Sequence, residues 1–81
     1  MYLHLGSNCV VSAQDMIAII NLSFLESAEI NERIERAREE KRLINISEKG
    51  KEKSLIISDK NVYISPISST TLYKRKFFDI N

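Results

Sequence analysis

The first twelve residues contain two short runs in which apolar and polar positions alternate. Residues 2–5 and 8–12 are β-prone, and the dipeptide Gly6-Ser7 between them predicts a tight hairpin in which glycine supplies a positive φ. A loop of two residues places His4 opposite Cys9 on the paired strand. The pattern therefore predicts an N-terminal hairpin that brings an imidazole next to a thiol.

The next apolar stretch has a different pattern. Residues 16–20 are five consecutive apolar side chains with no polar residue among them. A run of this kind is typical of a strand that is buried on both faces or packed against a neighbouring subunit. We therefore expect residues 16–20 to form the central strand of the sheet.

A helical period replaces the strand pattern after Ser27. Ile30, Ile34 and Ala37 recur at i, i+4 and i+7, so they share one face of an α-helix, and Ser27 is a suitable N-cap. We predict the helix over residues 28–41. Two oppositely charged pairs at i, i+4 spacing support it, namely Glu29 with Arg33 and Glu32 with Arg36.

Strand patterns return in the second half of the chain. Residues 43–47 and 54–58 are separated by the charged, glycine-centred segment 48–53, which predicts a second hairpin. A turn at residues 59–61 leads into a further strand, so the sheet is expected to grow as a meander.

Pro66 ends that further strand, residues 62–65, because proline cannot donate to the ladder. The hydroxyl-rich segment 68–71 then predicts the start of a short C-terminal helix, with Tyr73 and Phe77 on one face. Together the elements predict one α+β domain over residues 1–81, with a small, mainly antiparallel sheet, one long helix and a short C-terminal helix.

The size of the chain favours self-association. An 81-residue chain buries only about 60% of the surface that its unfolded form exposes. Cys9 and His4 are the single cysteine and the single histidine, so neither an internal disulfide nor a zinc site of ordinary ligand number is expected. We therefore expect a homo-oligomer. No secretory signal pattern or membrane-spanning run is visible, which predicts a cytoplasmic protein without a membrane partner.

Charge is distributed unevenly along the sequence. Residues 1–40 hold three arginines and seven acids, a balance of −4, whereas residues 41–81 hold nine bases and four acids, a balance of +5. This polarity suits head-to-tail contacts between subunits, and it equally suits a basic half that faces a polyanion.

Catalytic chemistry has little support in the sequence. The expected His4/Cys9 pair is the one arrangement that resembles an activated nucleophile, and no third orienting group accompanies it. With Gly6 and Gly50 as the only glycines, the chain has no phosphate-binding or dinucleotide-binding glycine pattern. We therefore expect no catalytic residues, no cofactor and no metal.

Two basic segments are candidates for nucleic-acid binding. Lys49, Lys51 and Lys53 alternate in the turn, so they project together toward a phosphate backbone if the turn continues the period of two of a strand. A second segment, residues 74–76, follows Tyr73, but consecutive helical residues diverge by about 100° and form no flat patch. For this segment we expect the aromatic side chains to pack on the sheet.

Three segments of the chain carry a resemblance to a known family. They are Tyr2-Leu3-His4-Leu5-Gly6, Val10-Val11-Ser12 and, most specifically, Tyr63-Ile64-Ser65-Pro66-Ile67-Ser68-Ser69 followed by Thr71-Leu72 and Lys74-Arg75. In matching order over essentially the whole chain, they resemble the RemA/RemB family of small bacterial regulators of extracellular-matrix (biofilm) genes. The resemblance is closer to the RemB branch than to the RemA branch.

The resemblance implies a mechanism as well as a fold. RemA-type members are DNA-binding proteins whose subunits assemble into a ring that carries DNA, and their α+β fold is likened to LytTR DNA-binding domains. Gly50 matches the glycine of their basic hairpin turn. RemA-type members place arginines at the positions of Lys51, Glu52 and Asp15, so this chain has an acid at two of those positions.

The sequence thus predicts a DNA-binding transcriptional regulator of matrix genes that acts as a ring-like homo-oligomer. Lys49, Lys51 and Lys53 are the expected contacts with double-stranded DNA. The acids Asp15 and Glu52 favour an alternative, in which the oligomer acts through other regulatory proteins and does not bind DNA itself.

Overall fold

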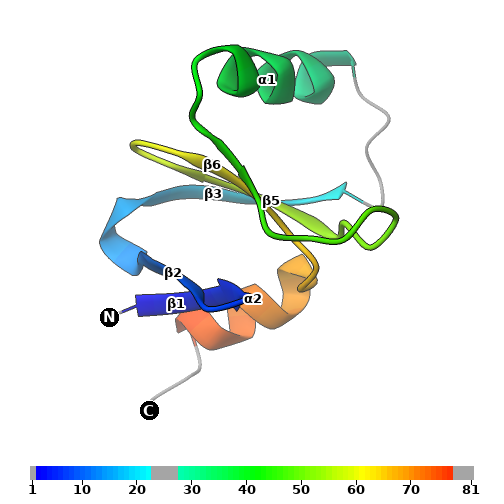
Figure 1. The fold of residues 1–81 in the computed structure, drawn as a ribbon. Coiled ribbons are helices and arrows are strands. Elements are labelled where there is room, and N and C mark those ends of the chain that lie inside the picture. Colours follow the sequence, from blue (N-terminus) through cyan, green and yellow to red (C-terminus); the bar gives the residue numbers. More distant parts are fainter. Residues whose placement is uncertain (1, 23–27, 78–81) are drawn as a thin grey trace.

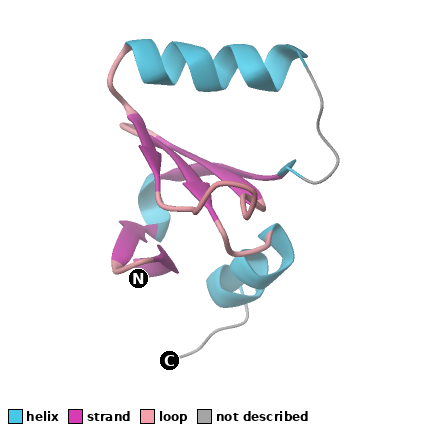
Figure 2. Ribbon diagram, turned by 45° about the vertical axis from the view of Figure 1, so that its right-hand side comes forward, coloured by secondary structure: helices cyan, strands magenta, loops and turns pink. Residues whose placement is uncertain are grey.

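The computed structural model describes residues 2–22 and 28–77, and its elements form three layers (Figures 1 and 2). A four-stranded sheet lies in the middle, with α1 (Ala28–Glu39) on one face and a two-stranded hairpin with α2 (Ser69–Phe77) on the other. The α+β class and the two helices are confirmed. The remaining elements are β1 (Tyr2–Gly6), β2 (Cys9–Ser12), the short 3-10 helix η1 (Ala13–Asp15), β3 (Met16–Asn21), β4 (Leu43–Asn45), β5 (Ser54–Ser58) and β6 (Val62–Ser65).

Each face of the sheet has its own apolar core, because successive strand residues point to opposite faces. Leu55 of β5 packs toward α1, and the next residue, Ile56, packs toward the hairpin and α2. The core on the α1 side consists of Ala37, Leu55, Val62 and Ile64. The core on the other side consists of Leu3, Leu5, Val11, Ile56, Tyr63 and Leu72.

The N-terminal hairpin is confirmed, but its turn lies one residue later than predicted. Ser7 and Asn8 occupy the turn with φ of 47° and 63°, the positive values that a type I′ turn requires at both central positions. The register pairs Gly6 with Cys9 and His4 with Val10. The predicted juxtaposition of His4 and Cys9 is therefore wrong.

β3 forms where the apolar run predicts a strand, but it is not central. The strand order is β3-β5-β6-β4, so β3 lies at one edge of the sheet. The absence of polar residues has another cause, since β3 contributes side chains to the cores on both faces of the sheet. Met16 and Ile19 pack into the hairpin-side core, whereas Ile20 packs into the α1-side core.

The predicted second hairpin, and with it the simple meander, is wrong. β4 does not pair with β5 but runs parallel to β6, with Leu43 opposite Val62. β5 has no edge left for β4, because β3 occupies one of its edges and β6 the other. The sheet is therefore mixed, with two antiparallel pairs and one parallel pair.

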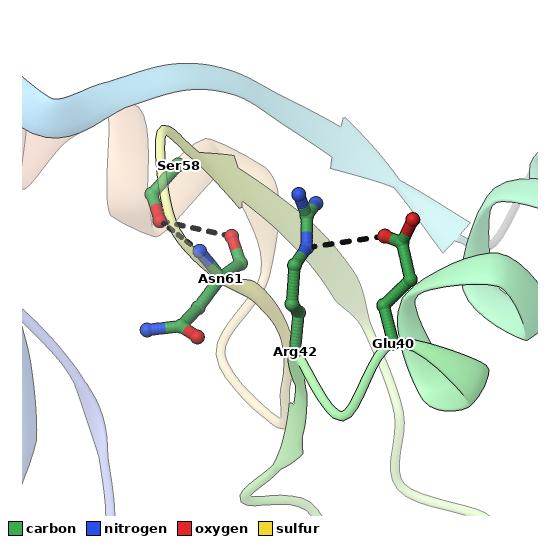
Figure 3. A network of polar contacts seen from close by, with 4 residues as sticks. All are labelled: Glu40, Arg42, Ser58 and Asn61. Atoms are coloured by element: carbon green, nitrogen blue, oxygen red, sulfur yellow. Dashed lines mark hydrogen bonds and ion pairs between the residues drawn. The ribbon is translucent and has the colours of Figure 1, made fainter.

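The hairpin between β5 and β6 is confirmed, and one serine closes its turn (Figure 3). The N–H of Ser58 donates to the carbonyl of Asn61 at 2.9 Å, and the Ser58 hydroxyl oxygen accepts the N–H of Asn61 at 3.0 Å. This buried serine thus fixes both backbone groups of Asn61.

α1 is shorter than predicted and ends at Glu39. Lys41 adopts a φ of +60°, the N–H of Arg42 donates to the carbonyl of Ala37, and the N–H of Lys41 donates to that of Arg38. This is a Schellman C-cap with lysine at the position that glycine usually occupies, so the sequence carries no glycine to mark it.

Charged pairs on α1 also differ from the prediction. Within residues 28–39, an ion pair joins Arg38 Nη1 to Glu35 Oε1 at 2.7 Å, at i, i+3 spacing. Neither predicted i, i+4 pair is formed there. Both partners are exposed, so the pair adds little stability. Ser27, the predicted N-cap, lies outside the described residues.

The segment between β6 and α2 ties the hairpin to the sheet. The buried Ser65 hydroxyl donates to the carbonyl of Leu5 at 2.6 Å and accepts the N–H of Ile67 at 3.0 Å. Gly6, with a φ of +113°, lies so close to Pro66 that an added Cβ would be 3.5 Å from the proline ring. Ser68 then caps α2, because its hydroxyl oxygen accepts the N–H of Thr71 at 3.2 Å.

Ser65→Ala is expected to lower the free energy of unfolding by about 1–3 kcal/mol, because it leaves a buried carbonyl and a partly buried N–H without this partner. Thermal unfolding at fixed protein concentration measures the loss. Ser47→Ala is the matched control, since the Ser47 hydroxyl bonds the carbonyl of Glu48 in an exposed position. Equal stability of the two variants would contradict the prediction.

In the part of the chain that the structure describes, no helix has both the length and the apolar character needed to cross a membrane.

Candidate nucleic-acid interface

The three predicted lysines lie in the loop that joins β4 to β5. The loop begins with an Asx turn, in which the Asn45 side-chain oxygen accepts the N–H of Ser47 at 2.9 Å. A tight turn follows, closed by the N–H of Lys51 donating to the carbonyl of Glu48 at 3.0 Å, and Gly50 takes a φ of +85° in it. The loop therefore does not continue the strand period of two on which the prediction relied.

The end of the loop is anchored in the sheet. The N–H of Lys53 donates to the carbonyl of Ser65 at 2.9 Å, and the carbonyl of Lys53 accepts the N–H of Leu22 at 3.0 Å. The backbone of Lys53 thus lies between the ends of β3 and β6, so the loop leaves the sheet from a fixed point. Lys49, Lys51 and Lys53 are all exposed.

Two of these lysines have no carboxylate partner among the described residues. Only Lys51 forms an ion pair, with its Nζ 3.3 Å from Glu48 Oε2. The side chains of this pair are 70% and 80% exposed, so water and salt screen the attraction and Lys51 can exchange Glu48 for another anion. Lys49 and Lys53 form no ion pair with a described carboxylate, so neither has to give up a partner before it binds another anion.

The acids Asp15 and Glu52 lie at opposite ends of the sheet. Glu52 directly precedes β5, next to the lysines, whereas Asp15 directly precedes β3 at the other end, where its carbonyl accepts the N–H of Asp59 at 3.0 Å. Of these two acids, only Glu52 therefore lies in the lysine loop (residues 48–53), where it opposes the charge of the lysines together with Glu48. The sequence could not show this separation, because it depends on the antiparallel pairing of β3 with β5.

Comparisons with known proteins place the chain in a family. The family model described as RemA-like, "Extracellular matrix regulatory protein A-like", matches residues 2–75. Extracellular matrix regulatory protein B of Bacillus subtilis (strain 168) is 36% identical over 78 residues, which cover 96% of this chain and 93% of that protein. The chain belongs to the RemA-like family. The resemblance drawn from the sequence is therefore confirmed.

The most specific segment of that resemblance has a structural role in this RemA-like chain. Ser65, Pro66 and Ser68 join β6, the N-terminal hairpin and α2 through the contacts described above. None of them needs a ligand to account for its position. The segment that carries the family resemblance therefore stabilises the fold.

Arg75, in the second basic segment (residues 74–76), also holds α2 and the N-terminal hairpin together. Its Nη1 donates to the carbonyl of His4 at 3.0 Å, which fastens α2 to β1. In the same helix Leu72 is fully buried, while Tyr73 is 44% exposed. Leu72 is therefore the residue of α2 that is fully packed in the core on this side of the sheet, and the expected packing of Tyr73 on the sheet stays a prediction. The side chain of Phe77 is outside the description.

The environment of Cys9 disfavours nucleophile activation. His4 is paired with Val10 instead of Cys9, and burial raises the pKa of the Cys9 thiol above its ordinary value. A raised pKa lowers the thiolate fraction at neutral pH, and the thiolate is the reactive form.

We therefore expect folded Cys9 to react with iodoacetamide at pH 7 more slowly than the same cysteine in urea, with a rate that increases as the pH rises. Mass spectrometry of the alkylated chain against time measures both rates. A faster reaction in the folded protein would show an activated thiol and contradict the assignment.

A cavity of about 250 Å³ lies between α1 and the sheet. It is lined by three glutamates and three arginines, so its charges balance and favour neither an anion nor a cation. Two of the lining residues form an ion pair, with Arg42 Nε 3.5 Å from Glu40 Oε1 (Figure 3). Residues 2–22 and 28–77 contain no group of three or more His, Cys, Asp or Glu that could hold a metal ion.

Proposed function

We propose that this protein regulates extracellular-matrix (biofilm) gene expression by binding double-stranded DNA as a homo-oligomer, without catalysing a reaction. The matrix role is supported by the RemA-like family and by the name of the Bacillus subtilis relative. The observation that supports the DNA contact is the lysine loop, which has three exposed lysines at one end of the sheet. Two of them have no carboxylate partner among residues 2–22 and 28–77. This role requires a cytoplasmic location.

Lysine suits contact with phosphate more than readout of bases. Its ammonium is a point charge without the planar fork with which arginine binds guanine. Lys49, Lys51 and Lys53 therefore favour binding that depends strongly on salt and weakly on DNA sequence. Specificity would then come from the shape of the DNA that the assembly can accommodate.

Assembly is essential to this proposal. A single subunit with three phosphate contacts binds weakly, whereas several linked subunits raise the avidity by about 10² to 10⁴ when they engage together. A ring-like homo-oligomer repeats the loop at a fixed spacing. The likeness to LytTR domains that the family resemblance implies stays a prediction.

The test is the binding of fluorescent promoter DNA of matrix operons, followed by anisotropy at about 50 and 200 mM salt, with the size of the protein measured by light scattering. We expect an assembled protein, strong binding at low salt and a steep loss at the higher salt. An assembled protein that does not bind at low salt would overturn direct DNA binding. The alternative, regulation through protein partners, would then take its place.

A further inference from the structure

The sheet has two edges, and both expose an isoleucine. In the described part of the chain β3 pairs only with β5, and β4 pairs only with β6. Ile17 of β3 is 70% exposed and Ile44 of β4 is 37% exposed, so each edge strand presents a large apolar side chain to solvent. An edge strand also presents backbone donors and acceptors that another strand can pair with.

β3 lacks most of the features with which proteins protect an edge strand. Its six residues include no proline and no charged side chain. An irregularity between Met16 and Ala18 interrupts only the beginning of its ladder, and the pairing is regular from Ala18 to Asn21. The apolar run of β3 predicted a central strand with a neighbour on each side, and the described residues provide a neighbour, β5, on one side.

The residues before the two edge strands carry opposite charges. β3 is antiparallel to β5, β5 is antiparallel to β6, and β4 is parallel to β6, so β3 and β4 start at the same end of the sheet. Asp15, exposed, directly precedes β3, whereas β4 is directly preceded by the exposed Lys41 and by Arg42, whose Nε also lies 3.5 Å from Glu40 Oε1. The two starts are thus complementary.

We propose that β3 of one copy pairs in parallel with β4 of the next copy, head to tail, with the two strand starts side by side. This pairing brings Asp15 next to Lys41 and Arg42 of the adjacent copy and places the exposed Ile17 and Ile44 at the junction. It rests on the assembly in the proposed function, and it names the surfaces that make that assembly.

Head-to-tail pairing has a consequence for the lysine loop. The strands run in the same direction in every copy. All loops of residues 48–53 therefore lie at the same end of the strands of the joined sheets. Such contacts close into a ring when the rotation between copies allows it. Pairing of β3 with a second β3 about a two-fold axis would be antiparallel, would place the loops on opposite sides and would leave β4 uncovered.

The experiment compares the sizes of the full-length parent and three variants by sedimentation velocity at micromolar concentration. Ile17→Lys and Ile44→Lys each place a charge on one edge strand. Val10→Lys is the matched control, because Val10 is 52% exposed and belongs to the N-terminal hairpin and to neither edge strand. We expect the parent and Val10→Lys to assemble, and each edge variant to sediment as a single chain.

Mixing the two edge variants gives the sharpest result. Ile44→Lys retains an intact β3 and Ile17→Lys retains an intact β4, so the mixture can form one junction and no more. We expect a species of twice the mass of one chain in the mixture. If Ile44→Lys does not fold by circular dichroism, the exposed Asp15→Lys replaces it and is expected to weaken assembly most at low salt.

The other outcomes separate this proposal from the proposed function. Assembly of Ile17→Lys like the parent would overturn the β3 junction. Disruption by Ile17→Lys but not by Ile44→Lys would overturn head-to-tail pairing in favour of β3 with β3. A single-chain parent would overturn both the junction and the oligomeric function, whereas normal assembly without DNA binding would overturn the DNA contact alone.

Discussion

Replacement of Lys51 by alanine is expected to lower the affinity for duplex DNA by a factor on the order of 10² at about 50 mM salt, because the contact is lost in every subunit that faces the DNA. The ion pair with Glu48 adds to the effect. Without Lys51, the exposed Glu48 carboxylate has no cation at 3.3 Å and faces the phosphates directly.

The dependence of affinity on salt measures how many phosphates the loop contacts. The slope of log K against log salt is about 0.9 per neutralised phosphate, so Lys51→Ala should lower it by that amount for each bound subunit. Lys60→Ala is the matched control, because Lys60 is exposed in the β5–β6 turn at the opposite end of the sheet. Equal slopes for the parent and both variants would exclude the loop as the contact.

Glu52→Arg is expected to act in the opposite direction. It removes the acid next to the lysines and supplies a forked donor, where the family resemblance implies an arginine. The affinity for promoter DNA should rise, and anisotropy titrations at the same salt concentrations measure the rise. Unchanged or weaker binding would show that position 52 does not face DNA in this protein.

Local patterns predicted the local elements of the fold. The helical period placed α1, the proline and hydroxyl residues placed the end of β6 and the start of α2, and the 59–61 turn predicted the β5–β6 hairpin. Strand neighbours were harder to predict, because they depend on which edges remain open once other pairs have formed. β4 joined β6 instead of β5 for that reason.

The candidate site shows the same division. The sequence identified the lysines of the loop, but the turn closed by Glu48 and Lys51 depends on Gly50 adopting a positive φ, which breaks the strand period. Likewise, the sequence indicated only that Arg75 is basic, whereas in the structure its side chain donates to the His4 carbonyl. Such a long-range contact leaves no local pattern to detect.

Leu72 is a residue at which the fold of this small protein is vulnerable. Its side chain is fully buried, and it belongs to the core that also contains Leu3 and Leu5 of β1, Ile56 of β5 and Tyr63 of β6. One leucine therefore packs α2 against both the N-terminal hairpin and the sheet. The polar contacts between these layers, from Ser65 and Arg75, depend on the same packing.

Leu72→Ala is expected to lower the free energy of unfolding by about 2–5 kcal/mol, through lost burial and the cavity it leaves. Small domains have a total stability of about 5–15 kcal/mol, so this variant should be partly unfolded at 37 °C. Urea unfolding at one fixed protein concentration measures the change, since assembly also contributes to stability. Leu72→Met is the matched control, because it conserves volume and should cost less than about 1.5 kcal/mol. If alanine and methionine at this position gave equal stability, the packing of α2 would not depend on Leu72, and the Ser65 and Arg75 contacts would hold the layers together by themselves.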